Sequence, residues 1–424
     1  MSVRTIRPFL TRAARIALAT ALCLAPSGAA AAPGAPPLVR VTRIDGSVLD
    51  AEAVRLDRGA KALAVRLAAG REEQVPLDTV VSLQFAGRST AKEAAEPGTL
   101  SLEFTNGDVV FGQPTGGNGE TIETISPLLG KKAFSIELLS RVLVPGNLDR
   151  RDRPEHFART GNEDTAWVKV SRGRDVVTGT LEKFDKEKVV IDTGKTLGQM
   201  AFDWSELVAL ALVVTDPPKP KSDFRAIVFG ADGSRLEGEL REISADGVDL
   251  EWTLGGEFRL PARRVESIGF VSPKFAYLSD LAPVRVVEYP YVGDASDVLF
   301  PFQRDRSVDG NRISIGDSGY SKGLGVHSYC ELVYDLGGSY ARFASDVGID
   351  DEVRAIEARG SVVFRVIVDG AVAWESPVLR GGEKAVRVPA VDLRGKRELR
   401  LVVDFADESD SGDRADWAGA FLAR

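Results

Sequence analysis

The sequence predicts an all-β chain in which tandem small β-barrels precede a C-terminal jelly-roll β-sandwich. Three observations support this prediction. One pattern of short strands and tight turns recurs four times before residue 273. From residue 275 onward, short alternating strands are separated by loops rich in glycine and aspartate. In this second region we find no convincing helix longer than two turns, which favours an antiparallel sandwich.

The first 32 residues differ from all that follow. Four arginines precede the apolar run 16–24, and the small residues GAAAA follow at 28–32. This order predicts a signal peptide over residues 1–31, cleaved near Ala31. The apolar run is too short to cross a bilayer, so we expect no transmembrane anchor. The mature protein is therefore expected to be secreted, or to lie in the periplasm or cell envelope.

Cysteine usage and charge narrow the class of protein. Cys23 lies inside the predicted signal peptide and leaves Cys330 as the one thiol of the mature chain, so no intrachain disulfide is expected. Removing the four arginines from a formal charge of −8 gives −12. An acidic surface argues against nucleic acid and anionic lipid as partners.

The repeated pattern opens with a strand and a turn and closes on a hydrophobic signature with the spacing φ-x-x-φ-x-φ. The opening segments are TRIDGSVLDA (42–51), EFTNGDVVFG (103–112), VSRGRDVVTG (170–179) and VFGADGSRLEG (228–238). The signatures are Val80, Leu83, Phe85; Leu139, Val142, Val144; Leu207, Leu210, Leu212; and Val265, Ile268, Phe270. Alternating hydrophobic residues of this kind are interpreted as core.

About 50 residues with about five short strands suit a small, strongly bent barrel. The pattern resembles the SH3-like or Sm-like class, without any of its binding residues. We expect repeats over 37–88, 97–147, 165–215 and 224–272, and a charged, exposed linker over 148–164 that divides them into two pairs. His156 in this linker lacks further metal-ligand neighbours and is interpreted as a solvated side chain.

The C-terminal region contains an ordered series of motifs: YLSDL, KGLGVHS with LVYDL, FASDVGIDDE, FRVIVDG with AWES, and DRADWAGAFL. In this order they closely resemble the NPCBM domain, a carbohydrate-binding module associated with glycoside hydrolase family 98 and related to carbohydrate-binding module family 51. The resemblance covers residues 274–424. It implies a β-sandwich that recognises sugars through loops at one edge, often with a structural calcium ion. Arg414 stands where the family pattern has a histidine.

The stretch GYSKGLGVHSYC (319–330) holds one histidine and the lone mature cysteine. Its glycines permit a tight turn into a strand. A zinc site would need more ligands, and a Cys–His nucleophile pair is disfavoured because residues three apart on a strand point to opposite faces. His327 is therefore either a packed, hydrogen-bonded residue or a contact to a sugar hydroxyl.

Further candidate sugar contacts are Tyr320, within this stretch, and Asp350, Asp351, Arg414 and Trp417, which follow it in the sequence. An aromatic ring can stack on the apolar face of a pyranose or fill the sandwich core, and both interpretations stay open for Trp417. The two aspartates either recognise hydroxyls or an ion, or they cap a turn through Asx hydrogen bonds.

The segment DFADESDSGDRADW places aspartates at every third residue, unlike the spacing of an EF-hand. A carboxylate-rich loop can hold calcium through a few side chains and carbonyls, or it can be solvated. The candidate calcium ligands are Asp407, Asp410, Asp413 and Asp416. No other cofactor is expected.

The favoured function is an exported, non-catalytic protein that binds a glycan or polysaccharide through its C-terminal module, with the repeats as scaffold. The alternative is a structural or assembly protein of the cell envelope, whose repeats bind partners or self-associate through strand edges. A glycosidase is disfavoured because every predicted domain is small and β-rich, and no segment resembles the usual catalytic barrel.

Overall fold

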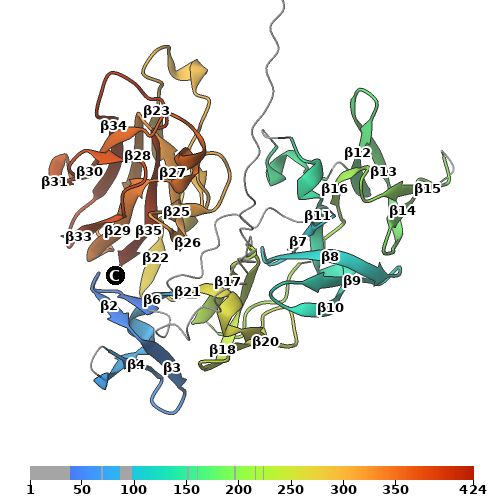
Figure 1. The fold of residues 1–424 in the computed structure, drawn as a ribbon, viewed down its shortest axis with the longest axis horizontal. Coiled ribbons are helices and arrows are strands. Elements are labelled where there is room, and N and C mark those ends of the chain that lie inside the picture. Colours follow the sequence, from blue (N-terminus) through green and yellow to red (C-terminus); the bar gives the residue numbers. More distant parts are fainter. Residues whose placement is uncertain are drawn as a thin grey trace, which may run out of the picture. The chain divides into compact units, whose positions relative to one another are not determined.

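Strands make up nearly all the regular structure in the computed structural model (Figure 1). The structure describes residues 39–424 except 68–69, 86–97, 150–151, 160, 195–196, 215 and 223, and its helical segments there are short 3₁₀ turns. The all-β prediction is therefore confirmed. The predicted signal peptide, with Cys23, lies outside the described residues. No helix within the described part of the chain is long and apolar enough to cross a bilayer.

Each of the four repeats opens with a hairpin and closes on the strand that carries its hydrophobic signature. Repeat 1 comprises β1 (Val39–Arg43), β2 (Val48–Ala51), β3 (Ala53–Asp57), β4 (Ala62–Arg66), β5 (Glu72–Pro76), η2 (Leu77–Thr79) and β6 (Val80–Phe85). Repeat 2 comprises β7 (Leu100–Phe104), β8 (Val109–Gly117), β9 (Thr121–Ser126), β10 (Gly130–Ser135), η3 (Ile136–Leu138) and β11 (Leu139–Leu143).

The other two repeats follow the same order of strands. Repeat 3 comprises β12 (Asp164–Val170), β13 (Gly173–Phe184), β14 (Lys188–Asp192), β15 (Gln199–Asp203) and β16 (Leu207–Ala211). Repeat 4 comprises β17 (Arg225–Gly230), β18 (Arg235–Ile243), β19 (Gly247–Trp252), β20 (Glu257–Pro261), η6 (Ala262–Arg264) and β21 (Val265–Val271).

The opening hairpins of repeats 1, 2 and 4 have Asp-Gly or Asn-Gly at their turns, whereas that of repeat 3 has Arg-Gly. In repeat 1, Gly46 has φ of +82°, a left-handed conformation that glycine adopts without steric cost. The preceding Asp45 accepts a hydrogen bond from the Ser47 backbone N–H at 2.9 Å. In repeat 2, Asn106 accepts the equivalent bond from the backbone of Asp108 at 3.1 Å. The side chain and the glycine thus fix the turn together.

The strand ladders do not close into the barrels that the sequence predicted. In repeat 4, β17 pairs with β18 and β21, while β18, β19 and β20 form a second ladder. The 3₁₀ turn η6 redirects the chain between β20 and β21, and among the described residues β20 pairs with β19 while β21 pairs with β17 and β6. Each repeat is therefore a strongly bent pair of ladders instead of a closed cylinder.

The signature strands also join one repeat to another. β6 of repeat 1 pairs antiparallel with β21 of repeat 4, with Leu83 opposite Ile268. β11 of repeat 2 pairs with β16 of repeat 3, with Val142 opposite Leu210. All four side chains are fully buried, and burial of one such side chain contributes roughly 1.5–3 kcal/mol. The pairing is thus 1 with 4 and 2 with 3, and not the division at residues 148–164 that the sequence suggested.

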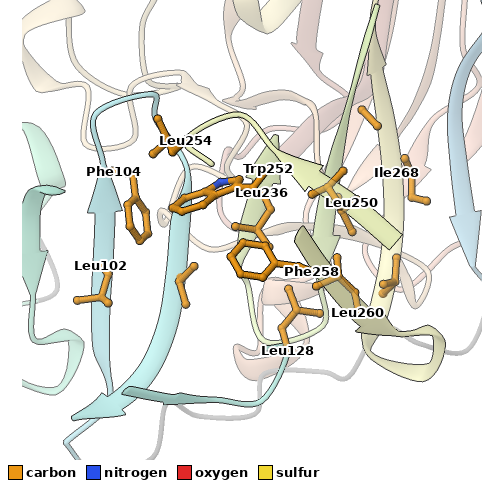
Figure 2. Packing of buried hydrophobic residues seen from close by; sticks show 14 of the residues in the cluster. Leu102, Phe104, Leu128, Leu236, Leu250, Trp252, Leu254, Phe258, Leu260 and Ile268 are labelled. Atoms are coloured by element: carbon orange, nitrogen blue, oxygen red, sulfur yellow. The ribbon is translucent and has the colours of Figure 1, made fainter. Parts of the chain in front are cut away.

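Repeats 2 and 4 also meet through an aromatic contact, shown in Figure 2. The ring of Trp252 on β19 lies 5.1 Å from Phe104 on β7, edge to face at 89°. The indole N–H of Trp252 donates to the Asp108 carboxylate at 2.7 Å. Asp108 is fully buried and also pairs with Arg235 of repeat 4. A polar turn residue of one repeat is therefore built into the core of another.

Between repeats 2 and 3, the predicted linker 148–164 includes regular structure. The 3₁₀ turn η4 (Pro145–Asn147) directly precedes it, and η5 (Pro154–His156) lies within it. His156 is exposed, but the adjacent Phe157 is buried and packs edge to face on Trp167 at 5.4 Å. Only part of this segment is therefore a solvated, charged loop.

Residues 275–423 form a β-sandwich of two six-stranded antiparallel sheets (Figure 1, orange to red). The first contains β22 (Phe275–Tyr277), β24 (Gln303–Arg304), β27 (Gly323–His327), β29 (Arg342–Ile349), β33 (Val386–Asp392) and β35 (Arg414–Ala423). The second contains β23 (Arg285–Glu288), β28 (Cys330–Asp335), β30 (Ser361–Val368), β31 (Ala371–Glu375), β32 (Leu379–Arg380) and β34 (Glu398–Phe405).

The connections of the sandwich include the hairpin β25 (Ile313–Ile315) with β26 (Ser318–Tyr320), and the 3₁₀ turns η7 (Leu278–Asp280), η8 (Ala295–Asp297) and η9 (Asp351–Ala355). The two sheets bury a common apolar core between them. At its centre Trp417 of the first sheet meets Phe364 of the second, edge to face at 5.1 Å and 85°. The predicted sandwich is confirmed.

Candidate functional site

A hollow of about 190 Å³ opens where β27 passes into β28, beneath the loop that joins β23 to β24. This volume is smaller than the range of about 300–1,000 Å³ found for drug-sized ligands, so the pocket suits a single small ring. The lining residues are Glu288, Tyr289, Pro290, Asp297, Val298, Leu299, Phe300, His327, Ser328, Tyr329, Asp410, Ser411, Gly412 and Arg414.

Two predicted site residues, His327 and Arg414, meet in this pocket because their strands pair. They are direct cross-strand partners at the ends of β27 and β35. Phe300, from the loop after β23, packs against both. Its ring lies 5.0 Å from the His327 imidazole at 24° to parallel, and the Arg414 guanidinium lies 5.2 Å from its centre. One aromatic ring thus organises the pocket wall.

The Arg414 charge is compensated within the protein. Its side chain is 8% exposed and pairs with Asp309 at 3.0 Å and with Glu352 at 3.9 Å. Glu352 also accepts hydrogen bonds from Ser307 and Asn311, at 2.6 and 3.0 Å. A guanidinium held by two carboxylates offers N–H donors with little net positive charge. It therefore suits a neutral ligand better than an anion.

His327 is partly buried, and this burial lowers the pKa of its imidazole below the usual 6.5. The ring is therefore neutral at pH 7. Nδ1 lies 3.0 Å from the backbone oxygen of Ser328, which requires the proton on Nδ1 and leaves Nε2 as an acceptor. Such a nitrogen can accept a hydrogen bond from a ligand hydroxyl.

Two carboxylates of the pocket lining hold the 289–302 loop. Glu288 accepts the backbone N–H of Phe302 at 2.7 Å, and Asp410 accepts that of Tyr291 at 2.9 Å. Burial raises the pKa of Glu288. These bonds tie the loop at both ends and so fix the pocket wall.

Asp350 and Asp351, the aspartates of VGIDDE, lie outside the pocket lining. Asp350 is 2% exposed, accepts backbone N–H groups of Ser314 and Glu352, and lies near the fully buried Asp416 carboxyl. Burial raises the pKa of Asp350 to about 7 and that of Asp416 well above its usual value. Asp351 accepts two backbone N–H groups of the β25–β26 turn. Both residues thus support the loops that surround the site.

Three of the four candidate calcium ligands accept hydrogen bonds from the protein, and the fourth is buried. Asp407 accepts the Ser361 hydroxyl, Asp410 the Tyr291 backbone, and Asp413 the backbone N–H of Ser361 at 2.7 Å. Asp416 is buried against Asp350. Within the described residues, no group of three or more His, Cys, Asp or Glu side chains is arranged to hold a metal. The set does not fit a calcium ion, so no role is derived through one.

Two predicted aromatic contacts are core residues instead. Trp417 is fully buried between Phe343 and Phe364. Tyr320 is 5% exposed, and its hydroxyl donates to Asp346 at 3.0 Å. Neither ring is available to a ligand, because the surrounding strands are buried on both faces.

The aromatic residues that line the pocket were missed. Tyr289 and Phe300 lie in the 289–302 loop, and Tyr329 follows His327 by two residues. The only sequence signal was EYPYVG (288–293), in which aromatic residues alternate with proline and glycine directly after a strand. Together with His327 and Asp410 these rings can contact both the apolar faces and the hydroxyls of a small polar ring.

The comparisons with known proteins concern this same region. Residues 275–423 match the family model of the NPCBM/NEW2 domain. The chain is 36% identical over 117 residues to alpha-1,3-galactosidase B of Akkermansia muciniphila, a match that covers 27% of this chain and 14% of that protein. It is 30% identical over 136 residues to a Renibacterium salmoninarum protein named as an endo-alpha-N-acetylgalactosaminidase, covering 31% of this chain and 9% of that protein.

Among solved structures, the CBM51 of Clostridium perfringens GH95, in complex with methyl-galactose, is 29% identical to this chain. That match covers 35% of this chain and 99% of the solved chain, with a TM-score of 0.31. The chain therefore matches only 9% and 14% of the length of these two curated relatives. By this family match, residues 275–423 are an NPCBM/NEW2 domain.

Proposed function

We propose that this chain is an exported, non-catalytic carbohydrate-binding protein whose C-terminal domain holds the terminal sugar of a glycan in the pocket described above. The observation that carries the proposal is the arrangement of His327, Phe300 and Arg414 around one small hollow of an NPCBM/NEW2 domain. Aromatic rings pack on the C–H faces of a pyranose, while the imidazole and guanidinium hydrogen-bond to its hydroxyls.

Charge supports a neutral sugar. The Arg414 guanidinium is compensated by Asp309 and Glu352, and the lining also contributes Asp297 and Asp410. A carboxylated sugar would meet these acids without a free cation to offset them. Names of the related proteins, a galactosidase and an N-acetylgalactosaminidase, make galactose and N-acetylgalactosamine the first probes.

The pocket carboxylates favour binding over hydrolysis. A glycosidase uses two carboxyl groups, one on each side of the bond to be broken. Here Glu288 and Asp410 are each engaged by a backbone N–H of the 289–302 loop. We assign both to the support of this loop and expect no glycosidase activity.

For the repeats we propose a scaffold role. The alternative function is assembly through strand edges, and the signature strands are one set of candidate edges. Two pairs of these strands, β6 with β21 and β11 with β16, bind one another within the chain instead. This pairing makes an internal framework the better explanation of the repeats.

The test is a glycan array probed with the full chain, followed by calorimetric titration of each sugar bound. We expect binding to glycans ending in galactose or N-acetylgalactosamine. His327→Ala should lower the affinity by about tenfold or more, because the variant loses two or more hydrogen bonds or contacts to the sugar. Val372→Ala is the matched control because Val372 is 58% exposed on β31 and does not line the pocket. A folded chain that binds no glycan would refute the proposal.

A further inference from the structure

Beside the pocket, four aromatic rings, two of them exposed and two half-buried, continue its wall. Tyr289 lines the pocket and stacks on Tyr329, with ring centres 4.6 Å apart at 14°. Phe405, at the end of β34, lies 6.3 Å from Tyr289 and 5.3 Å from Tyr291. Tyr289 and Tyr291 are 41% and 43% exposed. We call these four residues the aromatic shelf.

The backbone holds the shelf in place without a ligand. Tyr289 and Tyr329 exchange two backbone hydrogen bonds, of 3.3 and 3.1 Å, which extend the ladder between β23 and β28. The backbone N–H of Tyr291 donates to Asp410, a residue of the pocket lining. Pocket and shelf are therefore joined by one set of hydrogen bonds, and little conformational entropy would be lost when a ligand covers both.

The surroundings of the shelf are acidic. Burial is the main cause of the raised pKa of Tyr289, and the negative charges of Asp404 and Glu331 raise this pKa further. The arginines next to these acids are engaged: Arg365 pairs with Asp404 at 2.6 Å, and Arg285 with Glu331 at 2.7 Å. Exposed ring faces among compensated charges suit an uncharged surface with apolar C–H groups.

We propose that the aromatic shelf is a second subsite, which binds the neutral pyranose residue next to the terminal sugar held in the pocket. The domain then recognises two or more linked sugars instead of one. This inference rests on the proposed function of the pocket. Its own support is the continuity of Tyr289 with the pocket lining and the exposure of Tyr291 beyond it.

The experiment compares affinities by calorimetry with the full chain. The probes are the methyl glycosides of galactose and N-acetylgalactosamine, and neutral di- and trisaccharides that end in the same sugars. We expect the oligosaccharides to bind about three- to tenfold more tightly, the range expected for one added aromatic contact. Tyr291→Ala should reduce this ratio to about one, Tyr291→Phe should keep most of it, and Val372→Ala should leave it unchanged.

The possible outcomes separate the two proposals. Equal affinity for monosaccharides and oligosaccharides, or a ratio that survives Tyr291→Ala, would overturn the second subsite while leaving the pocket intact. No binding of any probe by the folded wild-type chain would overturn the proposed function itself. A ratio that falls equally in Tyr291→Phe would assign the contact to the hydroxyl group instead of the ring and would also contradict stacking.

Discussion

The ring of Phe300 lies nearly parallel to the imidazole of His327, with centres 5.0 Å apart. Because the imidazole is the proposed acceptor for a sugar hydroxyl, the phenyl ring fixes the direction of that hydrogen bond. The same ring lies beside the Arg414 guanidinium. A residue from a loop thus determines the geometry of two residues on paired strands.

Phe300→Ala should therefore lower the affinity for the terminal sugar by about tenfold, roughly the effect of 1.4 kcal/mol. Phe300→Tyr retains the ring and should bind within about threefold of the wild type. Calorimetric titration with methyl galactoside or methyl N-acetylgalactosaminide measures both. Affinity unaltered by Phe300→Ala would show that the ring has no part in the site.

Binding should depend on pH through His327. Burial lowers the pKa of this imidazole below 6.5, so the neutral form predominates at pH 6.5 and above. Below it, protonation removes the Nε2 acceptor and places a cation beside Arg414, while the charges of Asp410 and Asp309 favour the protonated ring. We expect constant affinity from pH 8 to about 6.5 and weaker binding at lower pH. In His327→Gln, binding should be weaker but nearly independent of pH over this range; a retained decrease would assign the titration to another group.

Substitutions of Trp417 test whether this residue belongs to the core or contacts the ligand. The side chain is fully buried between the two sheets, so Trp417→Ala should destabilise the chain by about 3–5 kcal/mol through the cavity it leaves. Trp417→Phe should cost less, because most of the aromatic volume remains. Urea denaturation gives the stability, and sugar titration of the folded Trp417→Phe chain gives the affinity. Weaker sugar binding by this variant without a loss of stability would restore the ligand role.

These outcomes show what the sequence could and could not predict. His327 and Arg414 were identified because both lie in ordered family motifs, and the pairing of β27 with β35 brings them together. The direction of the Trp417 side chain could not be predicted, since β35 is buried on both faces and lacks alternation. Phe300 lies in a loop whose path depends on side-chain anchors far apart in sequence, Glu288 and Asp410.

The repeats show the same contrast between features that the sequence predicts and features that it does not. Their hydrophobic signatures were recognisable as core because hydrophobic residues recur at regular spacing along each strand. The pairing of β6 with β21, in contrast, joins segments about 180 residues apart in the sequence. Both edges carry similar side chains, so local pattern cannot select the partner.

The buried carboxyl pair Asp350 and Asp416 should make stability fall as pH rises. Burial, followed by the neighbouring Glu352 charge, raises the pKa of Asp350 to about 7, and the pKa of Asp416 is raised as well. The folded state then holds protons that the unfolded state releases near pH 4, so their contribution is complete below that pH and is lost as pH rises through about 7. Urea midpoints should be lower at pH 8 than at pH 5.

Asp350→Asn should flatten this dependence, because the amide cannot ionise. The variant should also be less stable at every pH, because its single amide oxygen can replace only one of the two carboxylate oxygens that accept the backbone N–H groups of Ser314 and Glu352. Asp335→Asn, on the exposed end of β28, is the matched control and should leave the slope unchanged. Equal midpoints at both pH values in the wild type would contradict the assignment.

The link between repeats 2 and 4 should depend on Asp108. This fully buried carboxylate accepts the Trp252 indole N–H and pairs with Arg235, so Asp108→Ala leaves the indole N–H without this partner and leaves Arg235 paired with Glu237 alone. Loss of one member of a buried pair costs about 3–5 kcal/mol. Asp50→Ala is the control: Asp50 pairs with Arg40 on the surface, at 3.1 Å, and exposed pairs contribute about 0–1 kcal/mol. Urea denaturation of the two variants should therefore differ by several kcal/mol, and similar small losses would mean that repeats 2 and 4 are not coupled through this carboxylate.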